Sequence, residues 1–204
     1  MVGEPTDTEL LETWASGASS AGEALVRRHY GAISRFFANK VSRDPEELVQ
    51  RTFLRCVEGR GTFRGDAPFR AYLYGVARNV LLEYFREKRR HAEVELDANA
   101  SSAHAFDPSP SQMITQRREI ALLLESLRRV PLDMQILLEL SYWEELSTSE
   151  VAAILDIPQG TVKGRLSRAR RLLAVEYERL GQEWGCTMPP LEAQLRDLPR
   201  PSNG

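Results

Sequence analysis

The strongest structural signal lies in residues 146–173, which read LSTSEVAAILDIPQGTVKGRLSRARRLL. Ser147 and Glu150 have the S-x-x-E spacing of a capping box, so the pattern predicts a helix that starts there. Proline suits the first turn of a helix and not its interior, so a second helix is predicted to begin between Pro158 and Thr161. Two short helices joined by a tight turn form a helix-turn-helix, whose second helix lies in the major groove of DNA.

The second of these helices has one apolar face and one basic face. Apolar residues recur every three or four positions from Val162 to Leu180, which predicts a buried stripe. The opposite face carries Lys163, Gly164, Ser167, Arg168 and Arg171, with Arg165 and Arg170 on its flanks. A solvated helix face normally mixes both signs of charge, whereas acidic residues return here only at Glu176. We therefore interpret this face as a DNA-binding surface, with a plain solvated face as the alternative.

Composition and charge restrict the class of protein. The chain has 204 residues, enough for one or two small domains. Its formal net charge is −2, which argues against a protein that coats nucleic acid nonspecifically, because the basic residues concentrate in residues 160–173 and 86–91. No stretch approaches the roughly 18 apolar residues of a membrane span, and the amino terminus is acidic, unlike a signal peptide. A cytoplasmic location without membrane insertion is therefore expected.

The residues that carry catalytic and metal chemistry are scattered. Cys56 and Cys186 are far apart, and neither they nor His29, His91 and His104 show the spacing of metal ligands or of a disulfide. An enzyme acting on DNA would carry clustered carboxylates or a nucleophile with its base, and the sequence displays neither arrangement. We expect no catalytic residue, no metal and no cofactor, and therefore a binding protein rather than an enzyme.

A change of composition separates two helical regions. Residues 92–112, AEVELDANASSAHAFDPSPSQ, contain no Lys or Arg and are rich in Ala, Ser, Pro and acidic residues. This composition predicts a flexible acidic linker. The expected fold is all-α, with two small helical domains at residues 1–91 and 113–180 and a tail at residues 181–204.

The tail has an apolar pattern of its own. After Pro189 and Pro190, leucines follow at i, i+4 and i+7, at Leu191, Leu195 and Leu198. The spacing predicts a short amphipathic helix, and a frayed terminus is the alternative, because so short a helix is marginal alone.

Two helical patterns in the first domain carry exposed polar residues. In residues 44–59 Asp44 can cap, Pro45 fits the first helical position, and the core face is predicted to hold Val49, Phe53, Cys56 and Val57. In the next helix the predicted buried stripe is Phe69, Leu73, Val76, Val80 and Tyr84. Its sides carry Arg70, Tyr74, Arg78, Asn79, Arg86, Lys88, Arg89 and Arg90. Aromatic residues beside arginines can bind single-stranded DNA, because the rings stack on bases and the arginines neutralise phosphates. The alternative is that the aromatic residues lie at the edge of the core and the arginines are plain surface charges.

The order of these pieces resembles the extracytoplasmic-function sigma factors, which give bacterial RNA polymerase its promoter specificity. The matching segments are EELVQRTFLR, FRGDAPFRAYLYGVARNVLLEYFREKRR and the helix-turn-helix with its GTVKGRLSRAR run. They lie between Gly22 and Leu180, the span over which the resemblance extends. The resemblance implies a region 2 domain at residues 1–91 and a region 4 helix-turn-helix domain at residues 113–180. It also implies a protein that binds core RNA polymerase and directs initiation at the minus thirty-five and minus ten elements.

The resemblance also assigns roles to individual residues. It assigns docking on core polymerase to Glu47, Leu48, Val49, Gln50 and Arg51. Members of the family commonly have an acidic residue at position 51. Recognition and melting of the minus ten element fall to Phe63, Arg64, Gly65, Asp66, Ala67, Arg78, Asn79, Arg86, Arg89 and Arg90. Tyr72 stands where a tryptophan is usual. Recognition of the minus thirty-five element falls to Thr161, Lys163, Gly164, Arg165, Ser167, Arg168 and Arg171.

The implied partners are core RNA polymerase, double-stranded and melted promoter DNA, and the anti-sigma factor that members often have. A stand-alone helix-turn-helix regulator with an amino-terminal sensor domain is the main alternative. It leaves the second basic and aromatic cluster, at residues 69–91, without a role.

Overall fold

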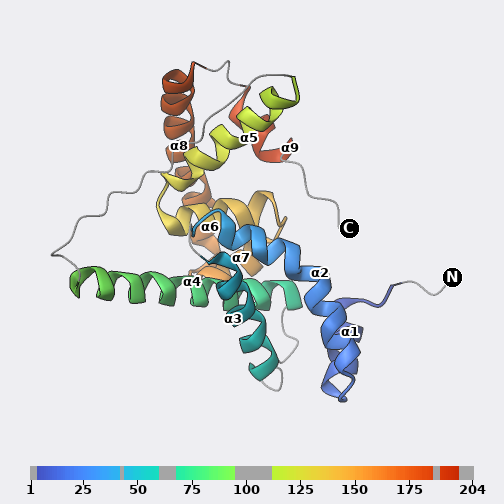
Figure 1. Cartoon of the computed structure of the whole chain (residues 1–204). Coiled ribbons are helices and arrows are strands. Elements are labelled where there is room, and N and C mark those ends of the chain that lie inside the picture. Colours follow the sequence, from blue (N-terminus) through green and yellow to red (C-terminus); the bar gives the residue numbers. More distant parts are fainter. Residues whose placement is uncertain (1–3, 42–43, 60–67, 95–111, 186–188, 198–204) are drawn as a thin grey trace. The chain divides into compact units, whose positions relative to one another are not determined.

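The chain folds into two compact helical units (Figure 1). The computed structural model describes residues 4–41, 44–59, 68–94, 112–185 and 189–197. The first unit contains α1 (Asp7–Ala15), α2 (Ser19–Ala38), α3 (Pro45–Glu58) and α4 (Phe69–Val94). The second contains α5 (Gln112–Arg128), α6 (Leu132–Tyr142), α7 (Thr148–Leu155), α8 (Gln159–Trp184) and α9 (Leu191–Asp197). All regular structure in the described residues is helical, so the predicted all-α class is confirmed.

The core of the first unit lies between α2, α3 and α4. Apolar residues at helical spacing on α2 are buried, among them Leu25, Ile33 and Phe37. Phe36 packs edge-on against Tyr74 of α4, with ring centroids 5.7 Å apart. Tyr74 is only 2% exposed, so the prediction that it lies at the side of α4 is wrong.

The buried faces of α3 and α4 differ in detail from the predicted stripes. On α4 the core takes Ala77 and Leu81, while Val76 and Tyr84 are only half-buried. On α3 Val57 is 37% exposed, so its predicted place in the core is also wrong. Which of several neighbouring apolar positions is covered depends on the helices packed against them, and helical spacing alone does not specify these.

The start of α3 agrees with the sequence in part. Pro45 occupies the first turn, as predicted. Asp44 stands at the N-cap position with a left-handed backbone, φ 47°, and its side chain makes no cap hydrogen bond. Asp44 therefore marks the helix start without capping it through its carboxylate.

Helix α1 is attached to α2 by polar and apolar contacts. A capping box starts α1, in which the Thr6 N–H donates to Glu9 Oε2 at 2.7 Å. This backbone hydrogen bond lowers the pKa of the exposed Glu9 carboxyl. Asp7 then lies 2.6 Å from the Arg28 guanidinium and 2.7 Å from His29 Nε2. At the other end of α1 the Trp14 ring covers Gly22, the one position in this contact where a side chain would not fit.

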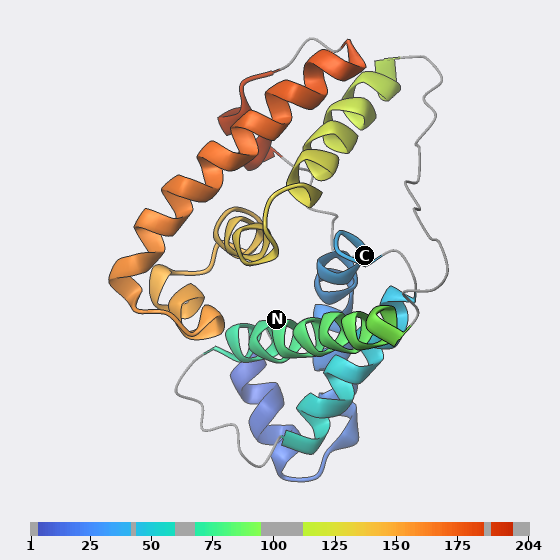
Figure 2. The ribbon, with the colours of Figure 1, turned by 90° about the vertical axis from the view of Figure 1, so that its left-hand side faces the viewer.

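The second unit is built along the long helix α8. Figure 2 shows α8 with α5 beside its carboxyl-terminal half, and α6 and α7 at its other end. The buried stripe of α8 contains Val162, Ala169, Leu173, Tyr177 and Leu180, each at most 2% exposed. Against it pack buried leucines of α5 and the buried residues 135–140 of α6.

The helix-turn-helix consists of α7 and α8. The Ser147 N–H donates to Glu150 Oε2 at 2.7 Å and the Glu150 N–H donates to Ser147 Oγ at 3.3 Å, so the predicted capping box is confirmed. Asp156 ends α7 in a left-handed conformation, φ 55°, and the Ile157 N–H donates to the Ala152 carbonyl. Helix α8 begins directly after Pro158, within the predicted range.

Several boundaries differ from those expected. Helix α4 continues to Val94, three residues into the stretch assigned to the linker, and α5 begins at Gln112, the last residue of that stretch. Helix α8 continues to Trp184 and so takes up the first residues of the predicted tail. The tail forms the short helix α9, and the frayed-terminus alternative is wrong for residues 191–197. Leu198 and Cys186 lie outside the described residues.

The described part of the chain contains neither a membrane-spanning helix nor a cluster of metal-ligating side chains. None of its helices combines the length and the apolar character needed to cross a membrane. Within the same residues no group of three or more His, Cys, Asp or Glu side chains could hold a metal ion.

Gly22→Ala is expected to destabilise the first unit by about 1 to 3 kcal/mol through overpacking. A Cβ at position 22 would lie 2.6 Å from Nε1 of Trp14. Gly75→Ala on α4 is the matched control, because a Cβ there meets no atom within 4 Å. Replacing this helical glycine should stabilise the protein by about 0.5 to 1 kcal/mol. Chemical denaturation measures both, and wild-type stability in Gly22→Ala would contradict the packing of Trp14 on α2.

Candidate nucleic-acid interface

The amino-terminal half of α8 presents a basic surface. Thr161, Lys163, Gly164, Arg168 and Arg171 are exposed, and Arg165 and Ser167 are half-buried. Arg171 Nη1 donates to Ser167 Oγ at 3.2 Å, one turn earlier on the same face. From Gln159 to Val175 the helix contains no acidic residue. The predicted separation of an apolar and a basic face is therefore confirmed.

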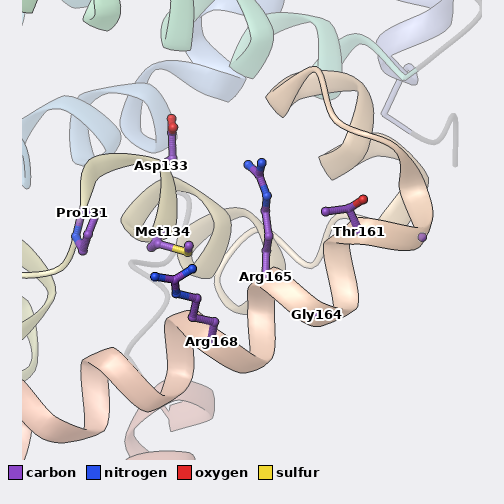
Figure 3. Close-up of a pocket in the computed structure, with 8 residues that line it drawn as sticks. Pro131, Asp133, Met134, Thr161, Gly164, Arg165 and Arg168 are labelled. Carbon is purple, nitrogen blue, oxygen red and sulfur yellow. The ribbon is translucent and has the colours of Figure 1, made fainter.

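A shallow recess adjoins this surface (Figure 3). It has a volume of about 550 Å³ and is lined by Pro131, Asp133 and Met134 at the start of α6 and by Gly160, Thr161, Gly164, Arg165 and Arg168 of α8. Figure 3 shows both arginine side chains extending from α8 to the side on which α6 lies. Sequence analysis missed the three α6 residues, because they precede the helix-turn-helix and carry no motif of their own.

Two glycines leave the backbone of α8 accessible beside the recess. A Cβ at Gly160 or Gly164 would have no atom within 4 Å, so packing within the chain does not require glycine at either position. Glycine inside a helix costs about 0.5 to 1 kcal/mol relative to alanine. At Gly164 this cost is consistent with a surface on which a partner comes close to the helix backbone.

The residues of α4 that the resemblance assigns to the minus ten element lie in two rows. Asn79, Arg86 and Arg90 are all exposed and lie on one face, since they are separated by seven and four residues. Arg78 and Arg89 form a neighbouring row, in which Arg78 is half-buried. The predicted loop residues Phe63, Arg64, Gly65, Asp66 and Ala67 lie outside the described residues.

Tyr72 lies half-buried near the start of α4. Its ring packs against that of Phe69, with centroids 6.2 Å apart. Burial is the main cause that raises the pKa of its hydroxyl. The Tyr72 ring therefore takes part in packing at the start of α4.

The residues assigned to polymerase docking divide between the core and the surface. Leu48 and Val49 are 2% and 1% exposed, so the structure places their side chains in the core of the first unit and not on a docking surface. Glu47 and Gln50 are exposed. Arg51 is half-buried beside two carboxylates, with its guanidinium 3.7 Å from Glu47 and 3.7 Å from Glu87 of α4.

An exposed apolar strip on α3 was missed by sequence analysis. Leu54 is 57% exposed and Val57 is 37% exposed. Their spacing from Glu47 and Gln50 places all four residues on one side of α3, and we call them the α3 strip. Tyr30 of α2 adds a further exposed ring, stacked on Phe53 at 6.3 Å. Large exposed apolar side chains next to polar ones are typical of a surface that binds another protein.

Ion pairs hold α3 against α4. Arg55 Nη1 donates to Glu83 Oε1 at 2.9 Å and Nη2 to Glu83 Oε2 at 2.5 Å. This two-point contact lowers the pKa of the Glu83 carboxyl and raises that of Arg55. The Arg51–Glu87 pair lies one turn earlier on α3 and one turn later on α4. The helix with the α3 strip and the helix with the basic rows are thus joined side by side.

The buried cysteine of α3 has low reactivity. Cys56 is 2% exposed, and burial raises its pKa to about 12. Its thiol therefore stays protonated at neutral pH and is a poor nucleophile.

Two family profiles match the chain. The one described as Sigma-70 region 2 matches residues 23–91, and the one described as Sigma-70, region 4 matches residues 120–173. The chain is 30% identical to the ECF RNA polymerase sigma-E factor of Escherichia coli (strain K12) over 177 residues, which cover 82% of this chain and 92% of the relative. The corresponding factor of Haemophilus influenzae is 28% identical over 183 residues, with coverages of 85% and 96%.

Two solved structures share the fold. CnrH in complex with the cytosolic domain of CnrY superposes with a TM-score of 0.64 at 24% identity, covering 86% of this chain and 99% of that chain. The sigma factor RpoE in complex with the anti-sigma factor NepR from Bartonella quintana gives 0.60 at 22% identity, covering 76% and 94%.

Arg51→Glu is expected to weaken the packing of α3 on α4, because it places a carboxylate beside Glu47 and Glu87. Adding Glu87→Arg should restore the lost stability, since the double change exchanges the two charges. Each single change should cost about 0.5 to 1 kcal/mol at this partly exposed site. Denaturation of the wild type, both single variants and the double variant gives the coupling energy. Strict additivity of the two losses would exclude the Arg51–Glu87 interaction.

Proposed function

Because this chain belongs to the extracytoplasmic-function sigma factors of the sigma-70 family, we propose that it binds core RNA polymerase and directs transcription initiation at specific promoters. The observation that carries the proposal is the pair of basic surfaces, on α8 and on α4, each built on its own helical unit. The role requires DNA and protein binding and no covalent chemistry by this chain. The proposed location is the bacterial cytoplasm, where promoters and polymerase are found.

In this proposal the second unit reads the minus thirty-five element through α8. Exposed Lys163 and Arg168 suit base edges and phosphates, because arginine pairs with guanine at two points and lysine neutralises phosphate charge. Gly164 allows the duplex to approach the helix closely. A duplex seated on α8 would also reach the α6 residues that line the recess, so Asp133 and Met134 join the proposed interface.

The first unit is proposed to hold the melted minus ten element on α4. Asn79 offers an exposed amide for hydrogen bonds to an unpaired base, and Arg86 and Arg90 on the same face suit its phosphates. Capture of unpaired bases would offset the few kcal/mol that unstacking costs, by about 1 to 3 kcal/mol for each stacked base. The loop at residues 63–67 is assigned to the same task by the family resemblance alone.

Core polymerase is proposed to dock on the α3 strip. Leu54 and Val57 supply apolar area, while Glu47 and Gln50 supply polar contacts at its edge. Leu48 and Val49 support this surface from the core, and Arg51 braces α3 on α4. An anti-sigma factor, the partner named for the RpoE relative, would compete for such surfaces. We propose that the acidic linker at residues 92–112 follows a polymerase channel that otherwise holds nucleic acid.

The decisive experiment mixes the purified chain with core RNA polymerase and measures run-off transcription from a selected promoter library. The proposal expects transcripts that start at a common pair of promoter elements and need both proteins. Binding of the chain alone to specific DNA, without any polymerase-dependent transcript, would instead support a stand-alone regulator. That alternative is not favoured, because the family profiles match both units.

Arg168→Ala is expected to weaken binding at the minus thirty-five element by about 1 to 3 kcal/mol. Arg179→Ala is the matched control on the same helix, because Arg179 is exposed but paired with Glu176 and Glu183 away from the recess. Footprinting of polymerase complexes measures both variants. Equal protection of the upstream element in Arg168→Ala and wild type would refute the assignment.

Asn79→Ala is expected to reduce open-complex formation while leaving polymerase binding unchanged, because Asn79 is exposed on α4 and is not one of the four residues of the α3 strip. Permanganate reactivity of unpaired thymines measures the opening. The deficit should shrink on a template already mismatched across the start region. A deficit of the same size on both templates would count against a role in melting.

A further inference from the structure

We propose that the recess beside α8 receives the C5-methyl group of a thymine in the DNA duplex, and that Met134 provides the apolar contact for this group. Met134 lies on α6, outside the helix-turn-helix, and would be a specificity-determining residue for the upstream promoter element. This inference rests on the proposed function at one point, the binding of duplex DNA by α8, and does not depend on contacts with polymerase.

Part of the lining of the recess is apolar and open. Pro131 and Met134 line it from the start of α6, and Gly160 and Gly164 line it from α8 without any side chain. Pro131 is exposed and Met134 is half-buried, so both keep apolar surface that no other part of the described chain covers. A Cβ at either glycine would meet no atom within 4 Å, so the two glycines leave the recess accessible.

The charged residues of the recess favour DNA as its occupant and an uncharged group within it. Arg165 and Arg168 line the recess, and Figure 3 shows both extending from α8 to the side on which α6 lies, where they can hold the duplex. Asp133 is exposed and lines the same recess, so it adds a carboxylate there. A carboxylate repels a phosphate. The apolar lining beside it therefore fits the edge of a base better than the DNA backbone.

Thymine is the base whose edge matches an apolar lining. In the major groove the base pairs present hydrogen-bond donors and acceptors, and the C5-methyl group of thymine is the apolar feature among them. The thioether of Met134 is at most a weak hydrogen-bond acceptor, so it cannot read the polar groups well. Its three rotatable bonds let it adjust to a small apolar group. Met134 therefore selects for the methyl group and adds little preference among the other bases.

The expected contribution is small and specific to one group of atoms. Burial of one methyl group changes an equilibrium constant by about fourfold. An effect of this size requires duplexes that differ in the methyl group alone. Deoxyuridine in place of thymidine removes the methyl group and keeps the hydrogen-bonding groups of the base, and 5-methylcytosine in place of cytosine adds the same group.

The first test replaces each thymine of the upstream element in turn by deoxyuridine. The element is first selected from random duplexes with the full chain, alone and bound to core RNA polymerase. One replacement should lower the affinity of the wild type by about fourfold. Undiminished affinity with every deoxyuridine, or an element without thymine, would overturn the proposal.

The second test identifies the residue that contacts the methyl group. The ratio of affinities for the thymine and deoxyuridine duplexes should fall from about four to about one in Met134→Ala, and should stay near four in Met134→Leu, which keeps the apolar volume. Val175→Ala is the matched control, because Val175 is a 61% exposed apolar residue of α8 that does not line the recess. A ratio near four in Met134→Ala would assign the methyl group to another residue and overturn the proposal.

These ratios remain informative if a variant is less stable than the wild type. Each ratio compares two duplexes bound by the same protein, so the fraction of folded protein cancels. The converse substitution gives a further measurement, in which the sensitive thymine is replaced by cytosine or by 5-methylcytosine. The methylated duplex should bind the wild type about fourfold more tightly, and Met134→Ala about equally. Equal binding of both duplexes by the wild type would contradict recognition of the methyl group.

The failure of this inference is distinguishable from that of the proposed function. Specific DNA binding without any methyl effect would overturn the role of Met134 and leave the proposed function intact. Absence of specific DNA binding, with and without polymerase, would overturn the proposed function and this inference with it. A methyl effect that depends on Met134 in a chain that supports no polymerase-dependent transcription would support the inference and the stand-alone regulator.

Discussion

The burial of one stripe along α8 is the constraint on which the second unit depends. Val162, Ala169 and Leu173 point into the core, and the same stripe continues to Leu180 against α5. Because each residue turns the helix by about 100°, burying this stripe leaves Lys163 and Arg168 facing solvent. One helix therefore organises the domain core and presents the basic surface at a fixed angle to it.

The first unit joins the α3 strip to the basic rows of α4. Arg55 and Glu83 link α3 to α4 through two hydrogen bonds, and Arg51 adds a weaker pair with Glu87. Arg51, which stands where the resemblance leads to an expected acidic residue, thereby has a partner on α4. A partner bound to α3 and a partner bound to α4 would therefore be held by two helices that are joined to each other.

Local signals in the sequence predicted much of the fold. The Ser147 capping box and Pro158 act within one helical turn, so they correctly identified where both helices of the helix-turn-helix begin. Asp44 shows the limit of such signals, because its backbone is left-handed and its side chain makes no cap hydrogen bond. Val57 and Tyr74 were misplaced for a related reason, since spacing predicts an apolar face and not which edge of it a neighbouring helix covers.

The sequence by itself determined the all-α class, the helix-turn-helix and the basic face of α8, because helical periodicity and capping are properties of neighbouring residues. Only the tertiary structure decided that Met134 borders the recess beside Arg168, that Leu54 is exposed while Leu48 is buried, and that Leu195 is covered. These facts depend on side chains from different helices that meet after folding. The spacing of these residues in the sequence does not predict which of them come into contact.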